Sequence, residues 1–140
     1  MSRIINGGLG YDPQDIPVIE TFVAGENITK GNVVRMDTTG KNQYTVYQSD
    51  ANTVGVGIAQ ETVTSGGRIK VQTYGIGLQA LVTGGSAAAN AALKAGAAGA
   101  TAEVAAGTAC FAPIGYALDA DSSTTLAAGD YFLTVGPVYR

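Results

Sequence analysis

Histidine and tryptophan are absent from this 140-residue chain, and cysteine occurs once. Cys110 stands among small and apolar residues (TACFAPIG), so we expect a buried thiol that behaves as a small hydrophobic side chain. No histidine is present to activate it as a nucleophile or to help bind zinc. Asp119-Ala-Asp121 resembles the start of a calcium loop, but the glycine and glutamate such a loop requires are missing. We therefore expect no metal site, no cofactor and no catalytic residues.

Charge is also scarce. Only 14% of the residues are charged, against about 25% in an average soluble domain, and the net charge is −3. No basic stripe exists, which disfavours a protein that holds nucleic acid through its phosphates. Apolar residues make up 46%, yet only 7 Tyr and 3 Phe supply large rings. We interpret a chain with few charges and few large side chains as one whose surface faces other protein, in a homo-oligomer or on a partner.

Long apolar runs are missing as well. No stretch approaches the roughly 18 residues of a membrane-spanning helix. The opening MSRIINGGLGYDPQD lacks the apolar run of a signal peptide, so we expect no cleaved leader. Gly55-Val-Gly57 and Gly75-Ile-Gly77 do not continue into a dinucleotide fingerprint, and no phosphate loop is found. These absences disfavour an enzyme, and a small β-barrel enzyme is the least favoured of the interpretations weighed here.

Residues 1–17 form a region of their own. Their glycines and two prolines exclude a helix and a central strand. A free tail is usually poor in large apolar side chains, whereas this region has several. It is therefore predicted to be an extended arm that lies either on its own domain or on a neighbouring subunit. The candidate contact residues are Ile4, Ile5, Leu9, Tyr11 and Ile16.

From residue 18 the pattern is that of β-strands separated by turns. Residues 68–74 (RIKVQTY) alternate with period two, so Ile69, Val71 and Thr73 are predicted to face the core and Gln72 the solvent. Glycine-rich and Ser/Thr-rich links, such as 64–67 and 121–130, are predicted turns. The expected strands fall within 18–24, 32–37, 43–49, 54–60, 68–75, 75–84, 110–120 and 131–139.

Residues 86–109 hold 13 alanines in 24 positions. Ser86 is a suitable N-cap for a short helix through Ala95, with Gly96 ending it. Alanine is the best helix former, but a helix this short is marginal in isolation. The alternative is a loop and short strand in which Lys94-Ala95-Gly96 repeats the Lys30-Gly31 turn. Both alternatives stay open at this point.

The chain repeats itself. Residues 56–59 (VGIA) align with residues 114–117 (IGYA), and an acidic residue follows each, Glu61 or Asp119. Each copy then passes through a Ser/Thr-rich link to a glycine and another apolar strand. The second link is four residues longer. We therefore predict a β domain over residues 18–140 that consists of two related units, about 20–80 and 81–138.

Glycines occur at corresponding positions of the two predicted units. Glycine inside a strand indicates a bulge, a sharp bend at a barrel corner or a close backbone approach. Gly55 and Gly57 alternate on one face, which leaves room for another strand or for the alanine-rich segment. A tight corner is favoured over a ligand groove. The predicted corner glycines are Gly55, Gly57, Gly67, Gly115 and Gly129.

The order of these elements resembles a known family. A Lys-Gly turn, two strands, VGVGIA, a Ser/Thr-Gly turn and a strand ending in glycine are followed by a second round with IGYALDA and a final Gly-Asp strand. This arrangement, over residues 25–138, is similar to the capsid decoration or cement proteins of tailed bacteriophages. The segment TVGVGIAQETVTSGGRIKVQTYG also resembles the core of lambda-type head decoration proteins.

The resemblance implies a fold and a non-catalytic role. The fold is all-β, a compact β-barrel or β-tulip with an extended N-terminal arm and at most one short helix. The implied function is to bind the outer surface of a phage head, usually as a homotrimer, and to stabilise contacts between major capsid protein subunits. In lambda-type members an N-terminal segment pairs with a capsid strand, and the 1–17 arm stands in the corresponding position. No membrane or nucleic acid is implied as a partner.

A second interpretation belongs to another class. A phage tail or surface module that binds carbohydrate would present aromatic side chains on a rigid face. Tyr44, Tyr47 and Tyr74 are the candidates, although tyrosine in strands more often serves packing. Binding to glycans without affinity for a shell would favour this alternative.

Overall fold

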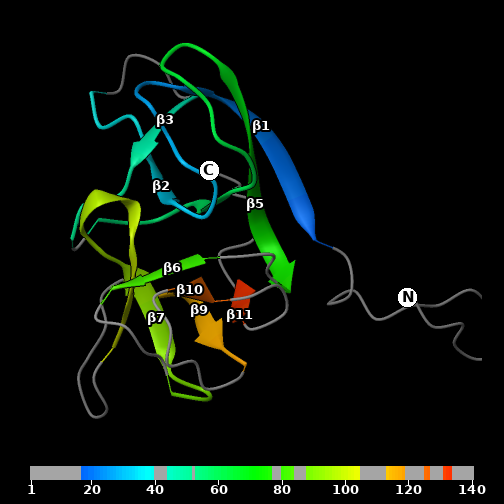
Figure 1. Cartoon of the computed structure of the whole chain (residues 1–140), viewed down its shortest axis with the longest axis vertical. Coiled ribbons are helices and arrows are strands. Elements are labelled where there is room, and N and C mark those ends of the chain that lie inside the picture. Colours follow the sequence, from blue (N-terminus) through cyan, green and yellow to red (C-terminus); the bar gives the residue numbers. More distant parts are fainter. Residues whose placement is uncertain are drawn as a thin grey trace, which may run out of the picture.

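The structure is a computed structural model that describes residues 17–39, 44–51, 53–76, 80–83, 88–104, 113–118, 125–126 and 131–133. Within these ranges the chain is almost entirely β, which confirms the predicted fold class (Figure 1). The strands and one short 3₁₀ turn, η2, are β1 (Val18–Ala24), β2 (Val33–Met36), β3 (Thr45–Gln48), β4 (Gly57–Ala59), β5 (Arg68–Ile76), β6 (Ala80–Thr83), β7 (Ala92–Ala95), η2 (Ala97–Gly99), β8 (Thr101–Glu103), β9 (Pro113–Ala117), β10 (Thr125–Leu126) and β11 (Tyr131–Leu133).

The first five strands close into a barrel, which we call the first barrel. Their order is β1-β3-β2-β4-β5, and β5 pairs back with β1 in antiparallel fashion. β1 runs parallel to β3, whereas the other neighbours are antiparallel. Closure removes most free strand edges, so the barrel needs few charged residues to protect them.

The remaining strands form a second ladder with the same pairing rules. β6 runs parallel to β8 as β1 does to β3, and β7 pairs antiparallel with β8 and β9 as β2 does with β3 and β4. β9 in turn pairs antiparallel with β11, as β4 does with β5. The second ladder, β6 to β11, occupies the lower part of Figure 1. The second ladder therefore repeats the order of strand pairs of the first barrel.

The main-chain hydrogen bonds fix the alignment of the two units. Gly31 N donates to Ala59 O over 2.9 Å, and Asn90 N donates to Ala117 O over 2.8 Å. Gly31 and Asn90 both have a positive φ, 92° and 63°. Gly57 lies opposite Val34 in the first unit, and Gly115 lies opposite Leu93 in the second. This register agrees with the alignment of residues 56–59 with 114–117 made from sequence.

The described part of the alanine-rich segment, residues 88–104, forms a hairpin and no α-helix. Residues 92–95 form strand β7, and η2 turns the chain into β8 through Ala98 and Gly99, whose φ angles are 54° and 73°. The helix alternative for 86–95 is therefore wrong where the structure describes it. The strand alternative is confirmed, but its proposed register is wrong, because Asn90 and not Gly96 is the equivalent of Gly31. Alanine forms a strand here because β8 and β9 pair with both edges of β7.

Two strands were not expected. β8 lies inside the alanine-rich segment, and the two residues of β10 lie inside the predicted turn 121–130.

The side chain of Gln72, predicted to face solvent, is fully buried. Gln72 Nε2 donates to Tyr74 O and Ile76 O, so the side chain lies along β5 toward the end where β11 pairs. The outer face of β5 is covered there by the second ladder.

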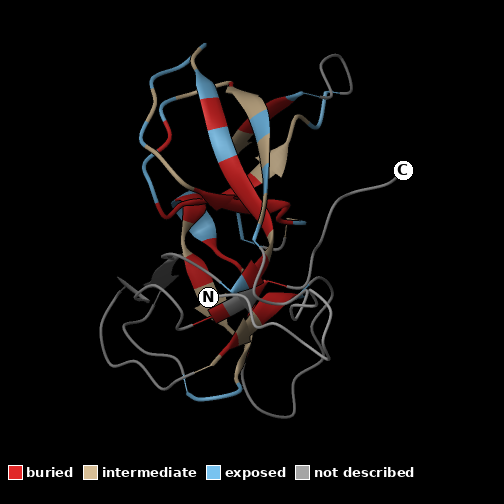
Figure 2. Cartoon of the chain, turned by 90° about the vertical axis from the view of Figure 1, so that its right-hand side faces the viewer, coloured by how far each residue is buried: buried red, intermediate tan, exposed pale blue. Residues whose placement is uncertain are grey.

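The buried side chains form two clusters, and one of them joins the units. The first cluster fills the barrel with residues such as Val46, Ile69 and Val71. The second contains Val33 and Ile58 of the first barrel together with residues of the second ladder. Those partners are Leu93, Ala95, Ile114, Ala117, Tyr131 and Leu133. Figure 2 shows buried residues continuing from the upper into the lower part of the molecule.

Two glycines allow close approach, Gly57 within the first barrel and Gly55 at the junction of the two units. A methyl group at Gly57 would collide with the main-chain oxygen of Gln72 and would lie 2.6 Å from Val71 Cγ1. A methyl group at Gly55 would lie 2.8 Å from Val33 Cγ1 and 2.9 Å from Ile114 Cγ2. Gly57 therefore sets the spacing of β4 and β5, and Gly55 sets the spacing of the two units.

We expect Gly57→Ala to lower the free energy of unfolding by about 1–3 kcal/mol, because β4 must move away from β5 to admit the methyl group. Chemical denaturation measures the change. Gly67→Ala is the matched control, since its methyl group would meet Thr64 O at 3.1 Å and Val63 Cβ at 3.6 Å. A Gly57→Ala protein no less stable than Gly67→Ala would contradict this account.

Candidate docking surface

The described residues hold no cluster of three or more cysteine or acidic side chains able to bind a metal ion. None of the described helices has the length and hydrophobicity needed to cross a membrane. What the described surface does offer is a set of exposed large apolar side chains. They are Ile19, Tyr44, Val54 and Ile76, with exposed fractions of 45%, 63%, 49% and 37%.

Two of these residues lie at one end of the ribbon made by β1 and β5. Ile19 is opposite Gln72, and Val18 is opposite Tyr74, so Ile76 lies just beyond the start of β1. Pro17, where residues 1–16 join the described chain, is exposed at the same end. The apolar surface of the ribbon is thus adjacent to the segment that was predicted to be an arm.

The three candidate tyrosines do not form one platform. Val23 N donates to Tyr44 O over 2.8 Å, whereas Tyr74 lies opposite Val18 at the other end of β1. Five residues of strand separate these points by about 17 Å. Tyr47 lies against Gly25 and under the Arg35 guanidinium, 5.3 Å from the ring centroid. Its ring is already occupied by contacts within the chain, which removes it from a stacking surface for sugars.

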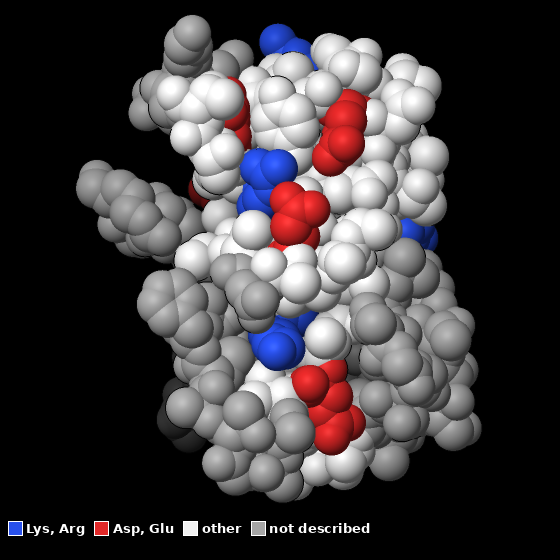
Figure 3. All heavy atoms as spheres, turned by 90° about the vertical axis from the view of Figure 1, so that its left-hand side faces the viewer, with Lys and Arg blue, Asp and Glu red and all other residues white. Residues whose placement is uncertain are grey.

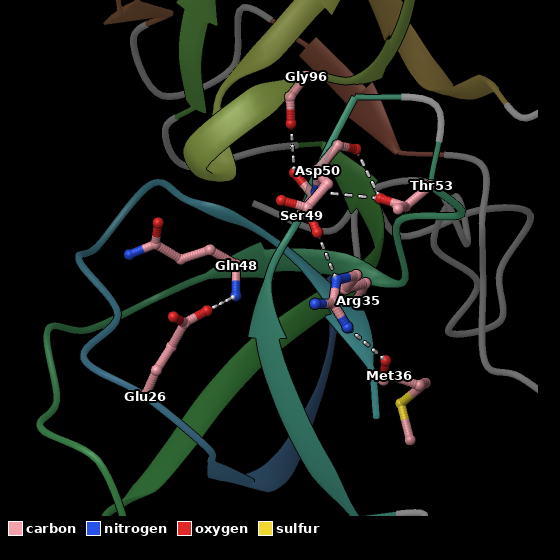
Figure 4. Close-up of polar contacts among 8 residues, drawn as sticks. All are labelled: Glu26, Arg35, Met36, Gln48, Ser49, Asp50, Thr53 and Gly96. Carbon is pink, nitrogen blue, oxygen red and sulfur yellow. Dashed lines mark hydrogen bonds and ion pairs between the residues drawn. The ribbon is translucent and has the colours of Figure 1, made fainter. Parts of the chain in front are cut away.

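Arg35 on β2 makes several contacts on the outside of the first barrel, and Figure 4 shows its hydrogen bonds. Arg35 Nε donates to Asp50 Oδ2 over 3.2 Å, and Nη1 donates to Met36 O over 3.3 Å. The Asp50 side chain is 67% exposed, so this ion pair contributes little to stability. The interaction of the Arg35 guanidinium with the Tyr47 ring contributes about 0.5–1 kcal/mol to stability at an exposed site.

The contact between the two units, which we call the seam, includes a buried polar interaction between Ser49 and Gly96. Ser49 Oγ donates to Gly96 O over 2.9 Å (Figure 4). Gly99 N donates to Ser49 O over 3.0 Å. The side chain of Asn32 lies against Gly99, where a methyl group would lie 2.8 Å from Asn32 Cγ. These contacts attach the β7–β8 turn to the first barrel. The sequence alone did not predict that Ser49 and Asn32 contact the β7–β8 turn, because these contacts depend on how the two units pack.

The predicted glycines lie in different settings. Gly55 precedes β4, Gly57 lies within it, and both are buried. Gly67 immediately precedes β5 and Gly115 lies within β9. Gly129 and the arm residues Ile4, Ile5, Leu9, Tyr11 and Ile16 lie outside the described residues.

Charge is distributed without a dominant sign on the face shown in Figure 3. Acidic and basic side chains are interspersed on this face, with uncharged surface between most of them. Such a pattern favours contact with another protein over contact with a polyanion.

Comparison with solved structures shows similarity in fold, and one of the matching structures comes from a bacteriophage head. No family model and no curated protein matches the sequence. The solved structure entitled "The crystal structure of head fiber gp8.5 N base in bacteriophage phi29" superposes with a TM-score of 0.62 over 89% of this chain and 100% of that chain. The two sequences are 16% identical. This chain therefore has the fold of a protein from a phage head.

We expect Ser49→Ala to lower the free energy of unfolding by about 1–3 kcal/mol, because Gly96 O loses a buried donor. Ser65→Ala is the matched control, since the Ser65 hydroxyl also donates to a carbonyl, Gly25 O, but lies at the surface. That control is expected to change stability by about 0.5 kcal/mol or less. Equal effects of the two substitutions in thermal unfolding would show that the seam is not a stabilising contact.

Proposed function

We propose that this chain is a structural capsid decoration protein that binds the outer surface of a phage head and stabilises contacts between major capsid protein subunits. The observation that carries the proposal is the fold shared with a phage head fiber base over nearly the whole chain. The proposed mechanism is adhesion. A barrel with a sparsely charged surface of mixed sign adds contact area across the boundaries between shell subunits.

The chemistry of the surface supports adhesion to protein. The exposed apolar residues Ile19 and Ile76 and the mixed charges offer area that desolvates at modest cost. Assembly as a homo-oligomer, with a trimer as the proposed form, gives several weak contacts per particle. On a symmetric shell such contacts act together and raise retention far above that of a single site.

The N-terminal segment is the proposed contact with a neighbouring subunit, through Ile4, Ile5, Leu9, Tyr11 and Ile16. Ordering an extended segment costs about 1–2 kcal/mol per residue in backbone entropy. Large apolar side chains offset that cost, at about 1.5–3 kcal/mol for each that becomes fully buried.

Purified protein is expected to co-sediment with intact heads of the phage that encodes it and to saturate at a copy number set by the shell symmetry. Decorated heads are expected to release DNA at a higher temperature than bare heads, because added contacts oppose shell rupture. Absence of co-sedimentation, together with binding to a glycan array, would overturn the proposal in favour of a carbohydrate module.

A variant that lacks residues 1–16 is expected to keep its β structure and to lose most of its retention on the shell. Circular dichroism and thermal unfolding provide the control for folding. Retention equal to that of the full chain would exclude the arm as a contact.

A further inference from the structure

The ribbon made by β1 and β5 has an outer face that combines apolar and basic side chains. Its inner face belongs to the core of the first barrel, through Phe22 of β1 and through Ile69 and Val71 of β5. Because side chains alternate along a strand, the residues between these face outward. Figure 2 shows the molecule from the side on which Figure 1 places the two strands. The outward residues that solvent reaches, which we call the outer patch, are Ile19, Thr21, Val23, Arg68 and Lys70.

The two cations of the outer patch keep a local positive charge. Arg68 and Lys70 are both exposed, and neither forms an ion pair with another residue that the structure describes. Glu20 lies opposite a core residue of β5 and is therefore on the inner face. Glu61 is the acid beside the patch, and its Oε1 accepts the main-chain N–H of Lys70 over 3.1 Å. Two cations against one carboxylate leave the patch positive, although the whole chain carries a net charge of −3.

The spacing and the neighbours of the two cations indicate what chemistry fits the outer patch. Residues two apart on one face of a strand lie about 7 Å from each other, which suits two carboxylates on one protein surface. On β1, Thr21 and Val23 lie directly opposite the cations and carry no charge. Ile19 continues this row with a side chain that is 45% exposed. A complementary surface therefore combines carboxylates with apolar side chains, as the contact surfaces of proteins do.

We propose that the outer patch binds an acidic protein surface of the phage head, with Arg68 and Lys70 each facing a carboxylate and Ile19 facing an apolar side chain. This inference rests on the proposed function and names the chemistry of the shell surface that the chain contacts. Attraction between opposite charges raises the rate of association and fixes the orientation of the partner. An exposed ion pair is weak by itself, but the pairs made by several copies in one oligomer act together.

A nucleic acid is a poorer match for the outer patch than an acidic protein. Proteins hold DNA by neutralising many phosphates at once, whereas this patch offers two cations on a chain whose net charge repels a polyanion. The exposed side chain of Ile19 would also face the phosphate backbone without an apolar partner. The charge and the apolar surface of the patch therefore both favour a protein.

Charge reversal on β5 tests the inference. Lys70→Glu is expected to bind intact heads of the phage that encodes the protein about tenfold more weakly than the wild type, because attraction becomes repulsion. Lys94→Glu on β7 is the matched control, since it changes the net charge equally but lies on the second ladder. The control is expected to bind as the wild type does. Co-sedimentation over a range of protein concentrations measures the affinity, and circular dichroism with thermal unfolding checks that both variants are folded.

Salt and a charge-conserving exchange separate the effect of charge from that of shape. The affinity of the wild type for heads is expected to fall as the NaCl concentration rises, and that of Lys70→Glu to fall less steeply. The double variant Arg68→Lys with Lys70→Arg keeps both positive charges and is expected to retain the affinity and the salt dependence of the wild type. Equal affinities of Lys70→Glu and Lys94→Glu, or loss of binding in the exchanged variant, would overturn the inference.

A zero-length cross-link identifies the partner. A carbodiimide joins a lysine amine to a carboxylate in contact with it, and mass spectrometry locates the amide that forms. On intact heads, Lys70 is expected to be joined to an acidic residue of a shell subunit. Joining of Lys70 to a second copy of this chain, or binding of duplex DNA that Lys70→Glu abolishes, would overturn the inference. Failure of the wild type to bind heads would overturn the proposed function as well, whereas equal binding of the two single variants would overturn this inference alone.

Discussion

Strand β5 is the constraint on which the rest of the molecule depends. Its first part closes the first barrel against β1 and β4, and its last residues, Gly75 and Ile76, pair with β11 of the second ladder. One continuous strand thus belongs to both units. The Ser49–Gly96 hydrogen bond and the buried cluster around Val33 and Ile58 hold the same two units together at other points. The second unit is therefore a continuation of the first sheet.

This arrangement explains the unusual composition. A unit of about 60 residues buries a small share of its surface and is marginally stable by itself, and few aromatic side chains reduce that burial further. Sharing a core across the junction adds burial without large residues, provided that the backbones approach closely. Gly55 and Ala95 allow that approach, since a methyl group at Gly55 would lie 2.9 Å from Ile114 Cγ2 and 3.7 Å from Ala95 Cβ. Alanine in β7 thus supplies a thin strand that fits against the first barrel, and its high helix propensity is overridden by pairing on both edges.

Sequence reasoning succeeded where a pattern is local. Period-two alternation located β1 and β5, and the repeated apolar-Gly-apolar-Ala element located β4 and β9 in matching registers. It did not succeed where tertiary packing decides. Gln72 alternates as a solvent-facing residue yet is buried by the second ladder, and β8 and β10 are too short to carry a period. The exposed residues Ile19 and Ile76 lie toward the same end of the β1–β5 ribbon only because these strands pair.

The shared strand and the shared buried cluster predict that the two units unfold as one cooperative body. The repeat offers a matched pair of probes for that cooperativity. Ala59 N donates to Asn32 O over 2.8 Å in the first barrel, and Ala117 N donates to Ala91 O over 2.9 Å in the second ladder. Native-state hydrogen exchange measures the opening free energy of each amide. A single cooperative body predicts equal values for the two, whereas an Ala117 amide that opens several kcal/mol more easily than Ala59 would contradict it.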